Sequence, residues 1–334
     1  MESGCADGTD KEQAGQGVIY FAGGCFWGMQ KFMDAIPGVL KTTCGYANGA
    51  LKNPTYAQVC GGNTGARETV RVVYDPHKVS LDALVYAFFS VIDPTQANRQ
   101  GPDVGSQYQT GIYYADAESG KTARRIAAVE ARRSSKFEVE IKPLTCFYDA
   151  EEEHQDYLRK HPGGYCHIPS GAVRRAQKLA VDPVSYQRPS DETLRSMLSS
   201  QSFDVTQRRG TEPPGSSEFW QNERNGIYVD VATGEPLFAS CDKYESSCGW
   251  PAFCKPIDGN VVREGVDVSH GMVRTEVTSR VGVSHLGHVF EGDSESPNGV
   301  RYCINGAALR FIAYDMMDAE GYGNLKGRVK RGRN

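Results

Sequence analysis

The feature of this sequence that most constrains its fold is a change of pattern near Asp182-Pro183. Before this point, segments with helical apolar spacing alternate with strand-like segments. Beyond Gly226, short apolar runs are broken by Gly, Pro and Asn. The chain has 334 residues, more than one hydrophobic core usually serves. We therefore expect an α+β domain followed by a separate, mainly β domain.

The predicted limits and elements follow the same pattern. We expect an N-terminal tail at 1–16, a first domain at 17–180, a linker at 181–187, a second domain at 188–325 and a basic tail at 326–334. In the first domain, strands are predicted at 18–22, 68–74 and 137–141, and helices at 26–35, 80–91 and 117–133. In the second, a helix is predicted at 191–198 and strands at 226–231, 261–263, 272–278, 299–304 and 308–314.

The charge balance and hydropathy exclude some partners. Lys and Arg number 37 and Asp and Glu 41, so nothing predicts attraction to nucleic acid or to an anionic membrane. No stretch approaches the roughly 20 apolar residues of a membrane helix. Cys5 could be the remnant of a trimmed lipoprotein signal, although we favour an incidental cysteine in a polar tail. The compartment, cytoplasm or cell envelope, therefore stays open.

The chain has ten cysteines, and no two of them form a C-x-x-C pair. A zinc knuckle or a thioredoxin-type active site is therefore not expected. Some of these thiols must be structural and others reactive, and only their local context can separate the two kinds.

The first reactive candidate lies in Gly-Gly-Cys-Phe-Trp-Gly, residues 23–28. Cys25 stands between a strand end and a helix start, where backbone N–H groups and the helix dipole favour a thiolate. Phe26 and Trp27 can line an apolar pocket beside it. A buried structural cysteine or a Gly-rich phosphate turn is the alternative, but neither explains a thiol and a Phe-Trp pair in the same turn.

This hexapeptide resembles the active-site signature of the methionine sulfoxide reductase A family. Three further segments are similar to that family: NPTYAQVCGGNTGARETVRVVYDP, DVGSQYQTGIYY and HPGGYCHIP, and the resemblance covers about residues 18–177. It implies a two-layer α/β sandwich in which Cys25 attacks the sulfoxide sulfur while Phe26 and Trp27 hold the S-methyl group.

The same resemblance gives roles to four polar residues: Glu68, Tyr56, Tyr108 and Asp103. Attack on a sulfoxide builds negative charge on oxygen, so a proton donor must lie within reach. Desolvation beside aromatic rings would keep Glu68 protonated, and the two tyrosine hydroxyls could share the oxygen. Without the resemblance, Glu68 on an amphipathic strand would be read as a solvated surface residue.

Oxygen transfer leaves Cys25 as a sulfenic acid, which a second thiol must resolve. Cys166 follows a glycine pair and matches family members with a resolving cysteine at this place. Cys44, Cys60 and Cys146 are competitors, and Cys146, in the apolar run LTCFY, is expected to be buried and inert.

The second half carries GIYVDVATGEPLF, SSCGWPAF, SHLGHVF and RYCINGAALRF in that order. The set resembles the methionine sulfoxide reductase B family over about residues 188–323. It implies that Cys303, on a strand, is the nucleophile. Because no helix dipole acts there, its activation is expected from Arg301, His285 and His288.

The B-type resemblance also assigns the rest of this site. His288 is expected to be the acid toward the sulfoxide oxygen, with His285 and Asn305 assisting. Trp250 forms the apolar wall, with Phe290 beside it. Cys248 matches the resolving position, and Cys241 and Cys254 are less favoured. Two histidines three residues apart could instead be a metal pair or a polar strand edge.

Many B-type reductases bind a structural zinc through two C-x-x-C pairs. The stretches we match to these pairs, 229–232 (VDVA) and 296–299 (SPNG), contain no cysteine. We therefore expect no zinc and no other bound cofactor.

Together, the resemblances imply a bifunctional methionine sulfoxide reductase, with the S epimer reduced by the A domain and the R epimer by the B domain, since each epimer has its own enzyme. Each disulfide would be recycled by a thioredoxin-like dithiol protein, and the substrate would be oxidised protein or free methionine sulfoxide. Two other classes of protein are alternatives, a zinc-stabilised binding module and a thiol hydrolase or amidase built on Cys25. The hydrolase needs a histidine base. His77, His154, His161 and His167 lie outside the motifs, although His167 beside Cys166 keeps this alternative open.

Overall fold

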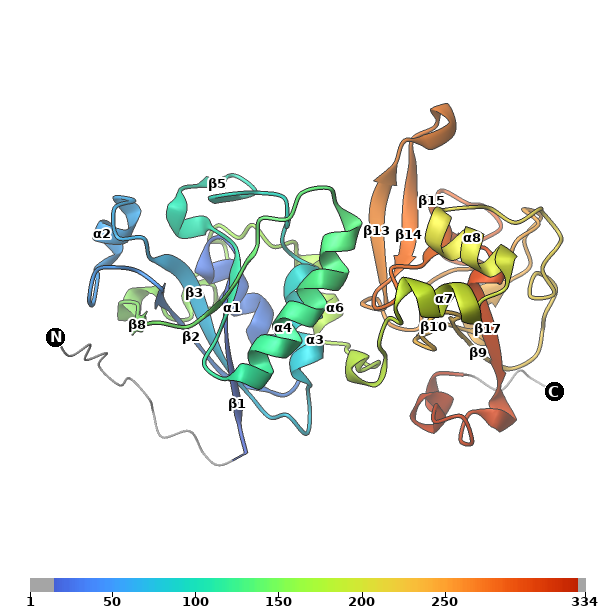
Figure 1. Cartoon of the computed structure of the whole chain (residues 1–334), viewed down its shortest axis with the longest axis horizontal. Coiled ribbons are helices and arrows are strands. Elements are labelled where there is room, and N and C mark those ends of the chain that lie inside the picture. Colours follow the sequence, from blue (N-terminus) through green and yellow to red (C-terminus); the bar gives the residue numbers. More distant parts are fainter. Residues whose placement is uncertain (1–14, 330–334) are drawn as a thin grey trace. The chain divides into compact units, whose positions relative to one another are not determined.

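The computed structural model describes residues 15–329, without the side chain of His270. The chain divides into two compact units, Met1–Val184 and Ser185–Asn334, which are described separately (Figure 1). The prediction of an α+β domain followed by a mainly β domain is confirmed. Cys5 lies outside the described residues, so the choice between a lipoprotein remnant and an incidental cysteine is not addressed. The finer division into tails and linker remains a prediction.

The first unit is built on a six-stranded sheet in the order β7-β6-β1-β3-β2-β8. All neighbours are antiparallel except β6 and β7. The strands are β1 (Gly17–Ala22), β2 (Val39–Ala47), β3 (Arg67–Tyr74), β6 (Gly111–Tyr114), β7 (Glu140–Pro143) and β8 (Phe147–Asp149), and a separate hairpin joins β4 (Arg99–Gln100) to β5 (Asp103–Val104). The main helices are α1 (Phe26–Asp34), α2 (Tyr56–Cys60), α3 (Leu81–Phe89), α4 (Ala117–Glu130), α5 (Tyr157–Lys160) and α6 (Ser170–Ala176).

Local sequence signals explain most of these elements. Ser80 caps α3 by accepting a hydrogen bond from the Ala83 N–H at 3.1 Å, as its position before an apolar-faced helix predicts. Gly24, with φ of 82°, turns the chain from β1 into α1, a conformation that favours glycine. The strand predicted at 137–141 is found three residues later, as β7.

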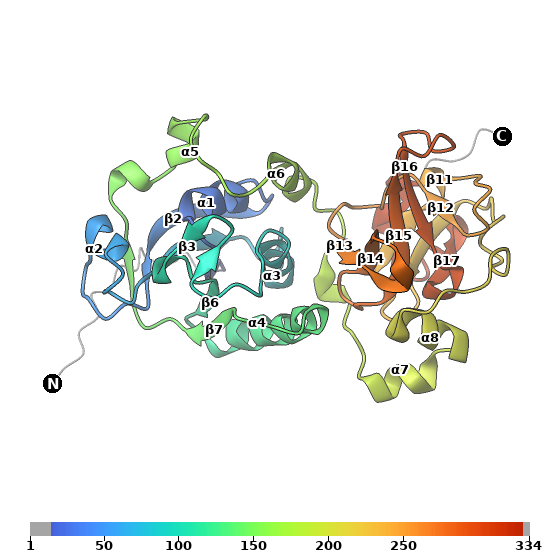
Figure 2. The same cartoon turned by 90° about the horizontal axis from the view of Figure 1, so that it is seen from above.

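The second unit contains two antiparallel sheets, ordered β11-β12-β16-β15-β14-β13 and β10-β9-β17 (Figure 2). Their strands are β9 (Gly226–Asp230), β10 (Pro236–Ala239), β11 (Lys243–Tyr244), β12 (Ala252–Phe253), β13 (Val262–Asp267), β14 (Arg274–Ser279), β15 (His285–Glu291), β16 (Val300–Ile304) and β17 (Leu309–Ala313). Two helices, α7 (Asp191–Met197) and α8 (Ser200–Arg208), precede them. The hairpin of β13 and β14 projects beyond the rest of the unit (Figure 1).

The contact between β15 and β16 needs a glycine. A Cβ atom at Gly287 would lie 2.1 Å from the carbonyl oxygen of Cys303, and the φ of Gly287 is 153°. The glycine therefore lets the strand that carries the two histidines lie directly against the strand that carries Cys303.

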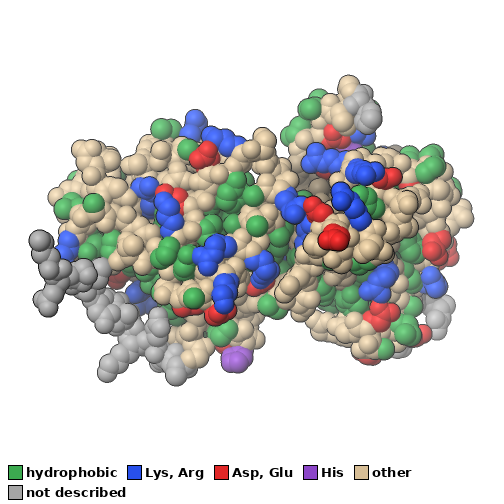
Figure 3. Space-filling view, viewed as in Figure 1, with side chains coloured by type: hydrophobic (Ala, Val, Ile, Leu, Met, Phe, Trp, Pro, Cys, Tyr) green, Lys and Arg blue, Asp and Glu red, His purple; other side chains and the backbone are tan. Residues whose placement is uncertain are grey.

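Two surface observations bear on partners. Within residues 15–329, no helix has both the length and the apolar character needed to cross a membrane. Lys and Arg are interspersed with Asp and Glu on the face that Figure 3 shows, in keeping with the nearly balanced charge of the sequence.

Candidate active sites

Cys25 is the N-cap residue of α1, and its side chain is buried. Burial raises the pKa of the Cys25 thiol, nearby Glu68 raises it further, and the backbone N–H groups of Trp27 and Gly28 lower it. The sequence-based expectation counted only the favourable helix start. Desolvation outweighs it, so the resting side chain is a thiol, which would have to lose its proton to act as a nucleophile.

Glu68 extends from β3 and is 1% exposed. Its Oε2 accepts a hydrogen bond from the Phe26 N–H at 3.1 Å, and its Oε1 has no hydrogen-bond partner among the described residues. Burial raises the pKa of Glu68 to about 8. The carboxyl is therefore protonated at neutral pH, with one oxygen available to a ligand, as a general acid requires.

Aromatic rings surround the two residues that follow Cys25. The Phe26 ring lies 6.4 Å from the Trp27 ring and 6.4 Å from the Tyr56 ring, measured between centroids. His154 lies 4.3 Å from Tyr56, and Tyr157 stacks on Trp27 at 3.9 Å. Sequence reasoning did not place His154 or Tyr157 here, because His154 ends a short 3-10 helix and Tyr157 begins α5, in a segment that carries no motif.

Tyr56, Tyr108 and Asp103 also converge on this region. Desolvation and the proximity of Glu68 raise the pKa of both tyrosine hydroxyls, which keeps them protonated as hydrogen-bond donors. Asp103 accepts a hydrogen bond from the Tyr165 hydroxyl at 3.1 Å. The structure thus brings together the polar residues that the resemblance named.

Cys166 lies against the first turn of α1. A Cβ atom built at Gly28 would be 3.4 Å from the Cys166 sulfur. Of its competitors, Cys44 is buried and donates to the Gln30 side chain at 3.3 Å, and Cys60 is exposed at the end of α2. Cys146 is only partly buried, contrary to the expectation of a buried thiol.

In the second unit, the sulfur atoms of Cys303 and Cys248 are 3.7 Å apart. The hydrogen bond from the Cys303 thiol holds the pKa of Cys248 at about 5, and contact with the Arg301 guanidinium also lowers it. The same hydrogen bond and burial raise the pKa of Cys303. Cys248 is therefore the more acidic thiol of the pair, and the proton is held on the Cys303 side of the hydrogen bond.

Both predicted histidines are held by carboxylates. His288 lies opposite Cys303 across the β15–β16 ladder, and its Nε2 is 2.7 Å from Asp267 Oδ2. Burial lowers the pKa of His288, whereas the bond to Asp267 raises it. His285 Nδ1 is 2.7 Å from Glu276 Oε1, and both side chains are buried. His288 is thus the imidazole placed beside the thiol pair.

The remaining predicted B-site residues frame the two cysteines. The Arg301 guanidinium lies 4.9 Å from the centre of the Phe290 ring and pairs with Asp293 at 2.6 Å. Trp250 Nε1 donates to the Glu212 carbonyl at 3.1 Å, and Asn305 bonds to the backbone of Glu212 and Leu286.

Glu212 was missed by sequence reasoning. Its carboxylate accepts hydrogen bonds from the N–H groups of Gly306 and Ala307 at 2.5 and 2.8 Å. It therefore fixes the loop that follows Cys303, although its own segment, TEPPGS, looks like an ordinary turn.

Asp230 belongs to the 229–232 stretch, which was matched to one cysteine pair of a zinc site, and it bonds to residues outside the 296–299 stretch that was matched to the other pair. Asp230 accepts hydrogen bonds from the hydroxyls of Ser279 at 2.6 Å and Ser284 at 3.1 Å, whereas Asn298 of the 296–299 stretch bonds to the Cys254 carbonyl. Hydroxyls paired to one carboxylate do not resemble the thiolate set of structural zinc. Within residues 15–329, no group of three or more His, Cys, Asp or Glu could hold a metal ion.

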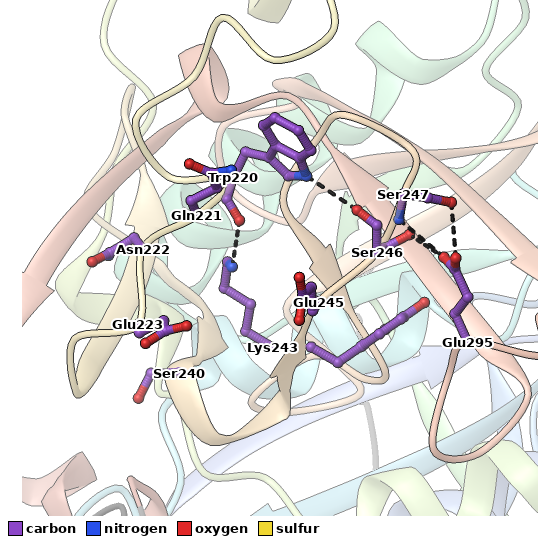
Figure 4. A pocket seen from close by; sticks show the side chains of 11 residues that line it. Trp220, Gln221, Asn222, Glu223, Ser240, Lys243, Glu245, Ser246, Ser247 and Glu295 are labelled. Carbon is purple, nitrogen blue, oxygen red and sulfur yellow. Dashed lines mark hydrogen bonds between the residues drawn. The ribbon is translucent and has the colours of Figure 1, made fainter.

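A polar cleft of about 1000 Å³ lies beside the loop that leads to Cys248 (Figure 4). Glu295 bridges Ser246 and Ser247 by accepting hydrogen bonds from both hydroxyls at 2.8 Å. Across the cleft, Lys243 Nζ donates to the Trp220 carbonyl at 2.7 Å. Glu295 therefore holds in place the two residues that precede Cys248.

The two cysteine centres and their α+β and β folds define a thiol-dependent oxidoreductase with two active sites. The family model described as "Peptide methionine sulfoxide reductase" matches residues 17–182, and that of the "SelR domain" matches residues 198–313. The chain therefore belongs to the methionine sulfoxide reductases, as a fusion of an A-type domain and a B-type domain. It reduces methionine sulfoxide, with the S and R reductase activities in its first and second domains respectively.

Several solved structures are similar to the first domain. Mxr1 from Saccharomyces cerevisiae in reduced form is 34% identical, with a TM-score of 0.45, covering 47% of this chain and 93% of that chain. Methionine sulfoxide reductase A of Corynebacterium diphtheriae is 38% identical, with a TM-score of 0.43, covering 48% and 87%. Mxr1 from Saccharomyces cerevisiae in complex with Trx2 is 23% identical, with a TM-score of 0.32, covering 45% and 91%.

Proposed function

We propose that each domain completes a full cycle with its own pair of cysteines, Cys25 with Cys166 in the A domain and Cys303 with Cys248 in the B domain. The attacking thiol becomes a sulfenic acid, and the second thiol converts it to a disulfide. A thioredoxin-like dithiol protein then reduces that disulfide by exchange. The observation that carries this proposal is the 3.7 Å separation of the Cys248 and Cys303 sulfurs.

In the A domain, the sulfoxide lies between Cys25 and the unpartnered oxygen of Glu68. The Cys25 sulfur attacks the sulfoxide sulfur, and the protonated Glu68 carboxyl donates its proton to the developing oxygen charge. The resulting hydroxyl group then passes to the Cys25 sulfur as the transient S–S bond breaks, which releases methionine and leaves the sulfenic acid. The thiol proton returns to Glu68. Phe26 and Trp27 hold the methyl group, Tyr56 and Tyr108 donate to the same oxygen, and Asp103 orients Tyr165 at the rim.

In the B domain, a neutral imidazole takes the place of the carboxyl. His288 accepts the proton of Cys303 as its sulfur attacks and then donates it to the sulfoxide oxygen, with Asp267 stabilising the transient imidazolium. The hydroxyl group then passes to the Cys303 sulfur as the transient S–S bond breaks, which releases methionine and leaves the sulfenic acid. His285, whose ring Glu276 holds in place, assists His288 in this proton transfer. Trp250 and Phe290 form the walls of the pocket for the methyl group. Arg301 stabilises the negative charge on the Cys303 sulfur, and Asn305 positions the loop that follows Cys303.

We further propose that the B domain folds without zinc, since Asp230 and its hydroxyl partners already satisfy one another. Elemental analysis of the purified chain should find far less than one zinc per molecule. About one zinc per chain, retained after mild chelation, would contradict this proposal.

The test of the cysteine pairs uses Cys166→Ser and Cys248→Ser with pure epimers. Cys166→Ser should release one equivalent of methionine from the S epimer and then stop under thioredoxin, while R-epimer turnover continues. Cys248→Ser should show the reverse. Cys60→Ser and Cys241→Ser, at exposed thiols, serve as matched controls that should turn over normally.

Peptide mapping of the oxidised wild-type chain supplies the second readout. The expected cross-linked peptides contain Cys25–Cys166 and Cys248–Cys303. A bond from Cys25 to Cys44 or Cys60, or from Cys303 to Cys241 or Cys254, would overturn the assignment of the resolving thiols and leave the attacking thiols in place.

A further inference from the structure

His167 follows Cys166 in the loop before α6 and carries a buried, unused nitrogen. Its Nε2 lies 2.9 Å from the Gly23 carbonyl oxygen. Because a carbonyl only accepts hydrogen bonds, Nε2 must carry the ring hydrogen, which leaves Nδ1 with a free lone pair. Within residues 15–329, Nδ1 has no hydrogen-bond partner, although it is buried.

The His167 ring and the Cys166 sulfur meet at the same point of α1. A Cβ atom at Gly28 would lie 3.0 Å from His167 Nδ1 and 3.4 Å from the Cys166 sulfur. The N–H of Gly28 also interacts with the Cys25 sulfur and lowers its pKa. One residue that lacks a side chain therefore lets both thiols and the free nitrogen gather at the start of the helix.

We propose that His167 is the general base of the disulfide-forming step, in which it removes the thiol proton of Cys166. This inference rests on the proposed role of Cys166 as the resolving thiol. It adds a catalytic group for the second step of the A-domain cycle, where Glu68 serves the first.

In disulfide formation, the Cys166 sulfur attacks the sulfenic sulfur of Cys25, an S–S bond forms, and the S–O bond of the sulfenic acid breaks. The thiol proton passes to His167 Nδ1 and then to the departing oxygen, which leaves as water. The sulfenic sulfur is reduced and the thiol sulfur is oxidised, both to the disulfide level.

The proton transfer requires the Cys166 side chain to move. Its sulfur now donates to the Ile168 carbonyl oxygen, 3.3 Å away, and makes no hydrogen bond with His167 Nδ1. Both atoms lie within 3.4 Å of the place that a Cβ atom at Gly28 would take. We expect a change of the Cys166 side-chain rotamer to bring the sulfur to Nδ1.

The groups that face His167 keep it neutral and ready to accept a proton. Burial lowers the pKa of the imidazole, and Asp103 raises it by a smaller amount. Asp103 accepts a hydrogen bond from the Tyr165 hydroxyl, and Glu68 is protonated at neutral pH. The Cys166 thiol is the titratable group that lies beside the ring at Gly28.

The variant that tests this role is His167→Gln, whose amide nitrogen can still donate to the Gly23 carbonyl but which has no base at Nδ1. Rapid-quench reactions with the S epimer, trapped by alkylation, report methionine release and disulfide formation separately. Methionine release should be unchanged. Disulfide formation at pH 7 should be about 10²-fold slower, as expected for loss of a general base.

The pH profile separates a base from a packing residue. Wild-type disulfide formation should vary little between pH 7 and 8, whereas the His167→Gln rate should rise about tenfold per pH unit, because hydroxide must replace the lost base. An unchanged rate, or a slower rate with the wild-type profile, would overturn the proposal.

A second variant covers the case in which His167→Gln disturbs the loop. In His167→Ala, added imidazole should restore disulfide formation, and pyrazole, which has the same shape but is a far weaker base, should not. Equal rescue by both would show that the ring only fills space. If Cys166→Ser recycles like wild type, the proposed resolving thiol is wrong, and that outcome is distinct from normal disulfide formation in His167→Gln.

Discussion

The two domains perform one reaction with opposite local designs. In the A domain the attacking thiol begins a helix, its pKa is raised by burial, and its proton donor is a carboxyl whose pKa is about 8. In the B domain the attacking thiol lies on a strand, 3.7 Å from its partner sulfur, beside a guanidinium and a carboxylate-bound imidazole. The A domain provides a buried carboxyl as its proton donor, and the B domain provides an imidazole. Each domain therefore obtains its acid from its own side chains.

The position of a cysteine at a helix start does not alone decide whether its side chain is a thiol or a thiolate. Cys25 has favourable N–H groups but lies buried beside Glu68, and desolvation dominates. Cys248 has no helix, yet its pKa is held low by the neighbouring thiol and by Arg301. Cys303, the attacking thiol of the B domain, keeps its proton as Cys25 does, because its hydrogen bond to Cys248 and its burial raise its pKa. Both sites therefore need a neighbouring group that handles a proton, Glu68 in one and His288 in the other.

The largest expected effect comes from removing each nucleophile. Cys25→Ser should abolish S-epimer reduction and leave R-epimer reduction nearly unchanged, and Cys303→Ser should do the opposite, because each site is complete in itself. Steady-state assays on the separated epimers check this. Loss of both activities in either variant, with circular dichroism showing a folded chain, would break the two-site comparison.

The next effect isolates the A-domain acid. Glu68→Gln keeps the shape of the side chain but removes its proton, so S-epimer single turnover should fall by about 10²–10⁴-fold. Glu138→Gln, a change at a surface ion pair with Lys136, is the matched control and should be neutral. An unchanged rate in Glu68→Gln at neutral pH would return Glu68 to a structural role.

A smaller effect is expected at the B-domain imidazole. Asp267→Asn removes the carboxylate that stabilises the His288 imidazolium, and hydrogen bonds to charged groups contribute about 1.5–3 kcal/mol, or roughly 10–100-fold in rate. R-epimer single turnover measures it. Glu264→Gln, at an exposed site on the same strand, should have little effect. Equal losses in the two variants would mean that the hairpin, rather than the carboxylate, matters.

The smallest effect is the pH dependence that distinguishes the sites. The acid form of Glu68 is lost as pH rises through about 8, so S-epimer single turnover should be level below pH 7 and fall about fivefold between pH 8 and 9. R-epimer reduction should lack this decline, and so should the residual activity of Glu68→Gln. An S-epimer rate that rises through pH 9 would show that thiol ionisation, not the acid, limits the A site.

Sequence reasoning grouped Cys25 with Glu68 and Cys248 with Cys303, which the structure brings together, because these residues lie in contiguous motifs; their catalytic roles stay predictions. It missed β2, whose segment VLKTTCGYA lacks an alternating apolar pattern, although β2 pairs with β3 and half of it is buried. His154, Tyr157 and Glu212 were missed for another reason. Each reaches its site through tertiary contacts that leave no periodic signal in the chain.

Burial was the other quantity that the motifs did not contain. The expectation for Glu68 depended on desolvation that only a folded environment produces, and the structure provides it. The expectation for Cys25 had the opposite outcome, because the helix start was visible in the sequence and the burial that outweighs it was not. The stretches 229–232 and 296–299 were each matched to one cysteine pair of a zinc site, whereas the Asp230 carboxylate bonds to Ser279 and Ser284. Which distant segments lie together depends on strand register, which the motifs do not contain.

The central claim is that the two sites act independently, and the most direct test is to map the oxidised cysteines after one turnover with a pure epimer. One equivalent of the S epimer should give only the Cys25–Cys166 peptide from the wild-type chain, and one equivalent of the R epimer only the Cys248–Cys303 peptide. A Cys25–Cys248 peptide, or both native pairs from a single epimer, would contradict the account.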